Sequence, residues 1–331
     1  MPHEGRSDLL DAVEGLAVEP ITQWDLFWSR LRRHRLAMLS AGFLVLITAI
    51  ALSAPLFTCP PGEANQFCGK LLENFAEPLK DPTGRLFVNI APRGDFPFGT
   101  DELARDVLSR VVHGGRASLL VGVLTGLLVA VLGTVVGSVA GYYPGPVDQS
   151  LMRFTDLILG LPLLPVAIVV GRLLPELEFL PEWSKEGVWG ISFLLGLLLW
   201  GSLARIVRAE FLSLREKEFV EAARAAGARD RRIIFRHILP NAMSPIIVQT
   251  TLIVGTAIII EAALSFLGFG VRPPTPTWGA MASSGAGVAV RGFWWELVFA
   301  GSALIATVLA VNYIGDGLRD ALDPTQTIER K

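Results

Sequence analysis

The sequence has few of the residues from which catalytic and metal sites are usually built. Its 331 residues include only two cysteines and four histidines, and the histidines are scattered at positions 3, 34, 113 and 237. It contains no His-Glu-x-x-His run and no Gly-x-Ser-x-Gly run. It also lacks a Gly-x-x-x-x-Gly-Lys-Ser/Thr run, because the Gly-Lys pair at 69–70 is followed by Leu71. We therefore expect a chain that is not an enzyme, holds no metal or cofactor and binds no ATP through a P-loop.

Charged side chains are also scarce. They make up 18% of the chain, whereas 51% of the residues are hydrophobic and the mean hydropathy is +0.49. Soluble domains carry about a quarter charged residues. Several apolar runs approach or exceed about 20 residues, the length that crosses the hydrocarbon core of a bilayer. The composition predicts an all-α polytopic membrane protein in a lipid bilayer, and a net charge of −2 gives no support for nucleic-acid binding.

The apolar runs predict six transmembrane helices, at roughly 36–57, 117–141, 151–173, 188–207, 245–269 and 293–314. Pro162, Pro165 and Pro175 make the third run the weakest. Because neighbouring helices can satisfy the carbonyls that proline frees, we expect this span to pack inside the bundle. Glycines at four-residue spacings along the second span indicate close packing against other helices.

The basic residues predict the orientation. Four arginines directly precede the first span, and the loop at 208–236 carries eight lysines and arginines. Positive charge stays on the cytoplasmic side, so we expect both termini to be cytoplasmic. Cys59 and Cys68 then lie in an outward loop, as either a disulfide or two free thiols. The predicted segments are an N-terminal tail (1–35), a first span (36–57), an outward loop (58–116), a region with the other five spans (117–316) and a C-terminal tail (317–331).

A charged, alanine-rich segment at 217–234 lies between the fourth and fifth spans. Its composition favours a helix, with Gly227 at an end or sharp bend and Pro240 stopping the helix before the fifth span. A short surface helix held between two spans could transmit force to both. From charge and helicity alone, a solvated cytoplasmic loop is the favoured interpretation.

The run Glu-Ala-Ala-Arg-Ala-Ala-Gly at 221–227, followed by His-Ile-Leu-Pro-Asn at 237–241, resembles the EAA loop of ABC importer permeases. In that family the loop docks on a separate ATPase subunit. The resemblance implies ATPase coupling at the following positions: Glu221, Ala222, Ala223, Gly227, His237, Leu239 and Pro240. The run Arg-His-Ile-Leu-Pro-Asn at 236–241 matches the peptide-importer branch, although other permeases often have an aliphatic residue in place of His237.

A second resemblance lies at 99–110, where Gly-Thr-Asp-Glu-Leu-Ala-Arg-Asp-Val-Leu-Ser-Arg is similar to a signature of the dipeptide/oligopeptide branch. We expect an amphipathic helix at the outer interface, capped by Thr100 and with Asp101 in its first turn. It would anchor the loop, or else contact a binding protein or line the entrance. Ala104 stands where the family has glycine.

The fifth span ends in a third matching run, at 261–270, with Glu261 inside the predicted helix. A buried ionisable residue in a span is a functional candidate. Glu261 would line the path or hold helices together, and both roles stay open. If the chain were instead an ion-coupled secondary transporter, Glu261 and Asp156 would be its main candidates.

Together these resemblances imply a permease subunit with the type I ABC importer fold, in a bacterial cell membrane. They also imply a second homologous permease, two ATP-binding subunits that hold ATP and Mg²⁺, and an extracytoplasmic substrate-binding protein. Transport would follow alternating access, with each permease forming half of the path. The implied substrates are dipeptides or oligopeptides, with nickel or another small solute as the alternative.

Overall fold

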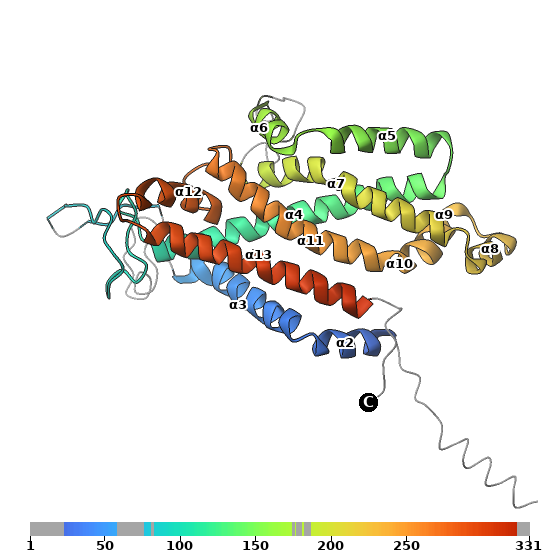
Figure 1. Ribbon diagram of the computed structural model, residues 1–331, viewed down its shortest axis with the longest axis horizontal. Coiled ribbons are helices and arrows are strands. Elements are labelled where there is room, and N and C mark those ends of the chain that lie inside the picture. Colours follow the sequence, from blue (N-terminus) through green and yellow to red (C-terminus); the bar gives the residue numbers. More distant parts are fainter. Residues whose placement is uncertain are drawn as a thin grey trace, which may run out of the picture.

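The computed structural model describes residues 23–57, 76–80, 83–173, 176, 181 and 187–322. The chain forms an elongated bundle of helices (Figure 1). Over the described residues it has isolated β-bridges but no β-strand. The helices are α2 (Gln23–Arg33), α3 (Arg35–Phe57), α4 (Val107–Tyr142), α5 (Pro146–Gly160), α6 (Leu163–Leu173), α7 (Gly187–Leu214), α8 (Glu218–Ala225), α9 (Asp230–Arg232), the π-helix η3 (Ile233–Ile238), α10 (Leu239–Asn241), α11 (Met243–Phe266), α12 (Trp278–Ala289) and α13 (Trp295–Leu322).

Five of the described helices, α3, α4, α7, α11 and α13, are long and apolar enough to cross a membrane. The predicted third span is a pair of helices, α5 and α6, that meet at 95°. The break falls at Leu161 and Pro162, where proline cannot donate a helical hydrogen bond and disfavours helical geometry in the residue before it. By length and composition, five unbroken helices and one broken pair thus correspond to the six predicted spans.

Helix α4 forms the centre of the bundle through its glycines. A Cβ at Gly137 would lie 2.5 Å from the carbonyl oxygen of Ala204 on α7, and one at Gly126 would lie 2.6 Å from Val254 on α11. Such small residues let helix backbones approach closely, as the glycine spacing predicted.

The predicted amphipathic helix at the outer interface is wrong. Residues 99–106 form a turn, and α4 begins at Val107 with Asp106 as its N-cap, accepting from the Ser109 amide at 2.7 Å. Thr100 does not cap a helix, because its hydroxyl accepts from the Ile90 amide at 2.9 Å. Asp101 instead accepts from two backbone amides of its own turn, and such local bonds compete with helix formation.

The predicted inward and outward segments lie at opposite ends of the bundle. Helices α2, α8 and α9 gather at one end, and α12 and the 76–106 segment at the other (Figure 1). The predicted tails are partly helical, because α2 covers 23–33 and α13 continues to Leu322. Residues 1–22 and 323–331 lie outside the described residues, as do Cys59 and Cys68.

Candidate functional site

Helix α8 is attached to the bundle along one face. Val220 is fully buried in a core cluster that includes Phe211 of α7 and Ile233 and Ile238 of η3. The charges of α8 suit its dipole, with Glu218 and Glu221 in the first turn and Arg224 in the last. The element that α8 packs on is η3, and residues from α4, α7 and α11 belong to the same core cluster, so η3 connects the helix to that core.

The other face of α8 is uncovered. Glu221, Ala222 and Gly227 are exposed, as three of the predicted coupling positions would need to be. Ala223 differs from that prediction, because it is half-buried and packs against the core cluster. With a helical period of 3.6 residues, Ala223 follows Val220 onto the attached face.

Gly227 ends the helix. Its φ is +79°, and it donates to the Arg224 carbonyl at 3.0 Å while the Ala228 amide donates to the Ala223 carbonyl at 3.0 Å. This pair of bonds is a Schellman cap, which needs a left-handed residue at this position. The turn expected at Gly227 is present, and it divides the predicted helical segment 217–234 into α8, α9 and the first residues of η3.

The remaining coupling positions, His237, Leu239 and Pro240, lie after α9, in η3 and α10. Leu239 is half-buried and packs on the core cluster. Its amide donates to the carbonyl of Ile234, five residues earlier, whereas an α-helical amide donates to the carbonyl four residues earlier. The half-buried His237 accepts from the Asn241 side chain through its backbone carbonyl at 2.6 Å. Pro240 is exposed, and it does not end the helical segment as predicted, because it lies inside α10. The preceding π-helix already lacks the α-helical hydrogen bond that proline would remove.

A tether that the sequence did not indicate holds the far side of this segment. The hydroxyl of Tyr142 donates to one carboxylate oxygen of Asp230 at 2.7 Å, and that of Tyr143 donates to the other at 3.3 Å. The tyrosines end α4 and Asp230 begins α9, so the bonds tie the second span to the turn after α8. The partners lie 88 and 87 residues apart, so no local pattern could pair them.

A strongly basic hollow lies next to the Gly227 turn. It measures about 420 Å³ and is lined by Arg229, Arg231, Arg232 and Phe235. All four residues are exposed, and the Phe235 side chain is 63% accessible. An acidic or apolar surface of another protein would find complementary groups here.

Neither candidate for ion coupling is an isolated intramembrane charge. Asp156 forms an exposed ion pair with Arg205 of α7 at 2.5 Å. Glu261 is fully buried within the chain and accepts from the Ser265 hydroxyl at 2.7 Å. Close by, a Cβ at Gly279 would lie 2.4 Å from Cα of Ala262, so α11 and α12 nearly touch. Glu261 thus lies inside a tightly packed junction of this chain.

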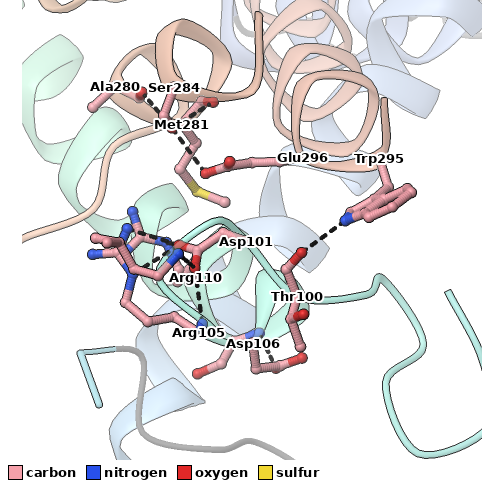
Figure 2. A network of polar contacts seen from close by, with 12 residues as sticks. Thr100, Asp101, Arg105, Asp106, Arg110, Ala280, Met281, Ser284, Trp295 and Glu296 are labelled. Atoms are coloured by element: carbon pink, nitrogen blue, oxygen red, sulfur yellow. Dashed lines mark hydrogen bonds and ion pairs between the residues drawn. The ribbon is translucent and has the colours of Figure 1, made fainter. Parts of the chain in front are cut away.

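The 99–110 signature forms a buried polar network at the opposite end (Figure 2). The Asp101 carboxylate, 1% exposed, accepts from its own turn and pairs with Arg105 at 2.7 Å and Arg110 at 3.5 Å. Trp295 donates to the Thr100 carbonyl at 2.9 Å, so α13 is bonded to the turn.

Two further features lie at this end of the bundle. Glu296, beside Trp295 on α13, accepts from Ser284 of α12 at 2.9 Å. Ala104 adopts a φ of +59°, the left-handed conformation that the family glycine would take without steric cost.

Comparison with known proteins identifies the family. Residues 133–328 match the binding-protein-dependent transport system inner membrane component, and residues 22–69 match the N-terminal TM domain of oligopeptide transport permease C. The chain belongs to this permease family. The first match extends from the middle of α4 to the end of α13 and so includes α8, while the second includes α2 and α3.

Curated relatives cover most of the chain. The dipeptide transport system permease protein DppC of Bacillus subtilis (strain 168) is 38% identical over 90% of this chain and 84% of its own length. The glutathione transport system permease protein GsiD of Escherichia coli O6:K15:H31 (strain 536 / UPEC) is 38% identical over 92% of this chain and 91% of its own. A putative peptide permease of Brucella suis biovar 1 is 42% identical over 72% and 76%, respectively.

A solved structure agrees on the fold. The MetNI methionine ABC transporter contains a chain that matches with a TM-score of 0.50 and 19% identity, over 65% of this permease and 97% of that chain. The type I importer fold and the predicted family are thus confirmed. The permease is an integral, multi-pass inner membrane component, and ATP hydrolysis and substrate capture lie in other subunits of such a system.

Proposed function

We propose that this permease forms half of the translocation path of an ATP-driven importer of dipeptides or oligopeptides. A second homologous permease supplies the other half, two ATP-binding subunits hold ATP and Mg²⁺, and an extracytoplasmic binding protein delivers the substrate. The peptide assignment is supported by relatives named for dipeptide and glutathione transport over about nine-tenths of the chain.

The attachment of α8 carries this proposal. One face of the helix is fixed through Val220, and the turn after it is fixed through Asp230 and the two tyrosines. The opposite face, with Glu221 and Ala222, is free to meet an ATPase subunit. A displacement of α8 would pass to η3 and, through the core cluster that η3 shares, to α4, α7 and α11, as rigid-body switching between inward- and outward-open states needs.

The same proposal sets the orientation. The end that carries α8 faces the cytoplasm, where ATP is available, and α12 with the 76–106 segment faces outward. The arginines around α2 and α8 at the cytoplasmic end support this arrangement.

A charge reversal at Glu221 tests the coupling role. In the purified complex, Glu221→Lys is expected to release the ATPase subunits and to abolish uptake, because it places a cation in a site that receives a carboxylate. Glu102→Lys is the matched control: Glu102 is exposed at the other end and forms an exposed 3.7 Å pair with Arg291. Normal ATPase retention and uptake in the Glu221 variant would refute the proposed docking role.

The substrate is tested separately. The complete transporter, with the binding protein encoded beside it, is reconstituted into vesicles loaded with ATP on the ATPase side. Uptake of a labelled dipeptide and of nickel is then compared. ATP-dependent dipeptide uptake that excess nickel does not inhibit is expected. Nickel uptake without peptide uptake would overturn the substrate assignment but not the permease assignment.

A further inference from the structure

Two exposed stripes on the adjacent helices α4 and α5 differ in chemistry. On α4 the exposed residues that recur at intervals of three and four are aliphatic: Leu120, Val123, Leu127, Val131 and Val135. On α5 the exposed residues at intervals of four, three and four are polar or glycine: Gln149, Arg153, Asp156 and Gly160. These four positions lie along one side of the helix and form the polar stripe of α5. Phe154 and Leu157 are also exposed, on the adjacent, apolar side.

Helices α4 and α7 run side by side in the same direction. A Cβ at Gly133 of α4 would lie 2.8 Å from Cβ of Leu203 on α7, and four residues further along both helices a Cβ at Gly137 would lie 2.7 Å from Cβ of Val207. A position on α4 therefore has a position of known depth beside it on α7.

The end of α5 lies at the middle of α7. A Cβ at Gly201 would lie 3.0 Å from Cγ of Leu159, and Gly201 is about 20 Å from either end of the 28-residue helix. Val131 and Gly201 each lie two residues before the contact of α4 with Leu203, so they are level with each other. Since α4 exposes aliphatic side chains at this level, the level lies within the hydrocarbon core of the bilayer.

The third span is interrupted at this same depth. Helix α5 ends at Gly160 and α6 begins at Leu163, and residues 160–162 are exposed at one edge of the bundle, away from α3 (Figure 1). The last four carbonyls of a helix have no partner within it. Lipid tails offer no hydrogen-bond partner either, so irregular backbone at membrane depth faces protein or water.

An exposed ion pair lies on the same side of the bundle. The Asp156 carboxylate accepts from the Arg205 guanidinium of α7, and the two side chains are 57% and 53% exposed. Arg205 follows Gly201 by four residues, about 6 Å nearer the α8 end. Charged side chains within spans face the bundle interior or a water-filled cavity, because facing lipid is costly. The ion pair and the helix break thus both need water beside α5.

We propose that the polar stripe of α5, the α5–α6 break and Arg205 line the water-filled path through which the substrate passes, while the aliphatic stripe of α4 faces lipid. The inference rests on the proposed function, in which this chain forms half of that path. The opposite charges of Asp156 and Arg205 match the ammonium and carboxylate groups of a zwitterionic peptide.

The accessibility of single cysteines in the complete transporter tests the path. The parent carries Cys59→Ser and Cys68→Ser and is reconstituted into vesicles, without nucleotide or trapped with ATP and vanadate. In at least one of these states, Gly160→Cys is expected to react at least about tenfold faster than Val131→Cys with a charged methanethiosulfonate, because the thiolate forms only where water reaches it. A Cβ at Gly160 would meet nothing within 4 Å, so the new side chain fits.

Val131→Cys is the matched control, because it is exposed at the same depth on α4. Both thiols should react equally after unfolding in detergent, which shows that both variants are present. Equal rates at the two positions in both states, or an unreactive Gly160→Cys, would overturn the proposal, since lipid or the second permease would then cover the break.

A charge test examines Arg205. In Asp156→Cys the guanidinium has lost this partner and should attract an anionic reagent. Adding Arg205→Gln is expected to lower the ratio of the rate with an anionic methanethiosulfonate to the rate with a cationic one about fivefold. An unchanged ratio would overturn the place of Arg205 in the path.

Uptake of peptide by the parent is measured separately from labelling. An unreactive Gly160→Cys in a transporter that imports peptide would overturn this inference and leave the proposed function standing. A reactive Gly160→Cys in a transporter that imports another solute would support the path and overturn the substrate assignment alone.

Discussion

The two ends of the bundle use charged residues in opposite ways. At the end with α8, Glu221 and the arginines beyond Gly227 are exposed, and the ties through Val220 and Asp230 leave them uncovered. At the other end Asp101 and Glu296 are each 1% exposed and accept hydrogen bonds from their own chain.

This difference separates stability from coupling. A buried charge is strongly destabilising when its partner is removed, because it is left without either water or a counter-charge. An exposed charge contributes little to folding and is free to bind another protein. Substitutions at the outer end should therefore act on the fold, whereas substitutions around α8 should act on transport.

The largest expected effect is that of Asp101→Ala at the outer end. The change removes the acceptor of two backbone amides and the partner of Arg105 and Arg110. We expect a loss of about 3–5 kcal/mol of stability, the usual cost of breaking a buried ion pair. Thermal unfolding of the purified complex measures it. Glu102→Ala, at an exposed neighbouring position, should change stability by less than about 0.5 kcal/mol, and equal effects at both positions would contradict the contrast.

A smaller effect, on transport instead of stability, is expected from Tyr142→Phe at the α8 end. The variant loses a 2.7 Å hydrogen bond to the Asp230 carboxylate, and a bond to a charged group contributes roughly 1.5–3 kcal/mol. Uptake should fall about tenfold while the ATPase subunits remain bound, because the docking face is intact. Tyr143→Phe removes a longer bond of 3.3 Å at an exposed position and should have less effect. Unaltered uptake in Tyr142→Phe would show that the tether carries no force.

The smallest expected effect is a gain in stability from Ala104→Gly. Ala104 has a φ of +59°, which costs a residue with a Cβ about 1–2 kcal/mol. Glycine relieves that cost but loses more entropy on folding and removes a methyl group that is fully buried, so the net gain should be about 0.5 kcal/mol. A rise of about 1 °C in the unfolding temperature checks it. Asn89→Gly is a useful reference, because asparagine tolerates its φ of +50° better than alanine does; an unchanged or lower temperature for Ala104→Gly would contradict the argument.

Predictions from the sequence succeeded where a local pattern by itself determines the structure. Apolar run length found the long helices, and Pro162 marked the break in the third span. Gly227 was correctly placed at a bend. The same reasoning missed the turn at 99–106, because helix propensity and an apolar stripe outweighed the local bonds that Asp101 makes to its own backbone. It also assigned Ala223 to the docking surface, since exposure depends on the face of α8 that Val220 buries.

The sequence alone determined that this chain spans a membrane, that its basic segments gather at one end, and that its motifs place it among importer permeases. Each of these follows from run length, charge or a short pattern that can be read without knowing any distant partner. Only the tertiary structure decided which face of α8 is free, that Asp230 is held by two tyrosines 88 and 87 residues away, and that Asp101 and Glu296 are buried at the same end. Those features depend on which helices meet in the bundle. Packing of the helices brings together residues that are far apart in the sequence, and no local pattern indicates that they will meet.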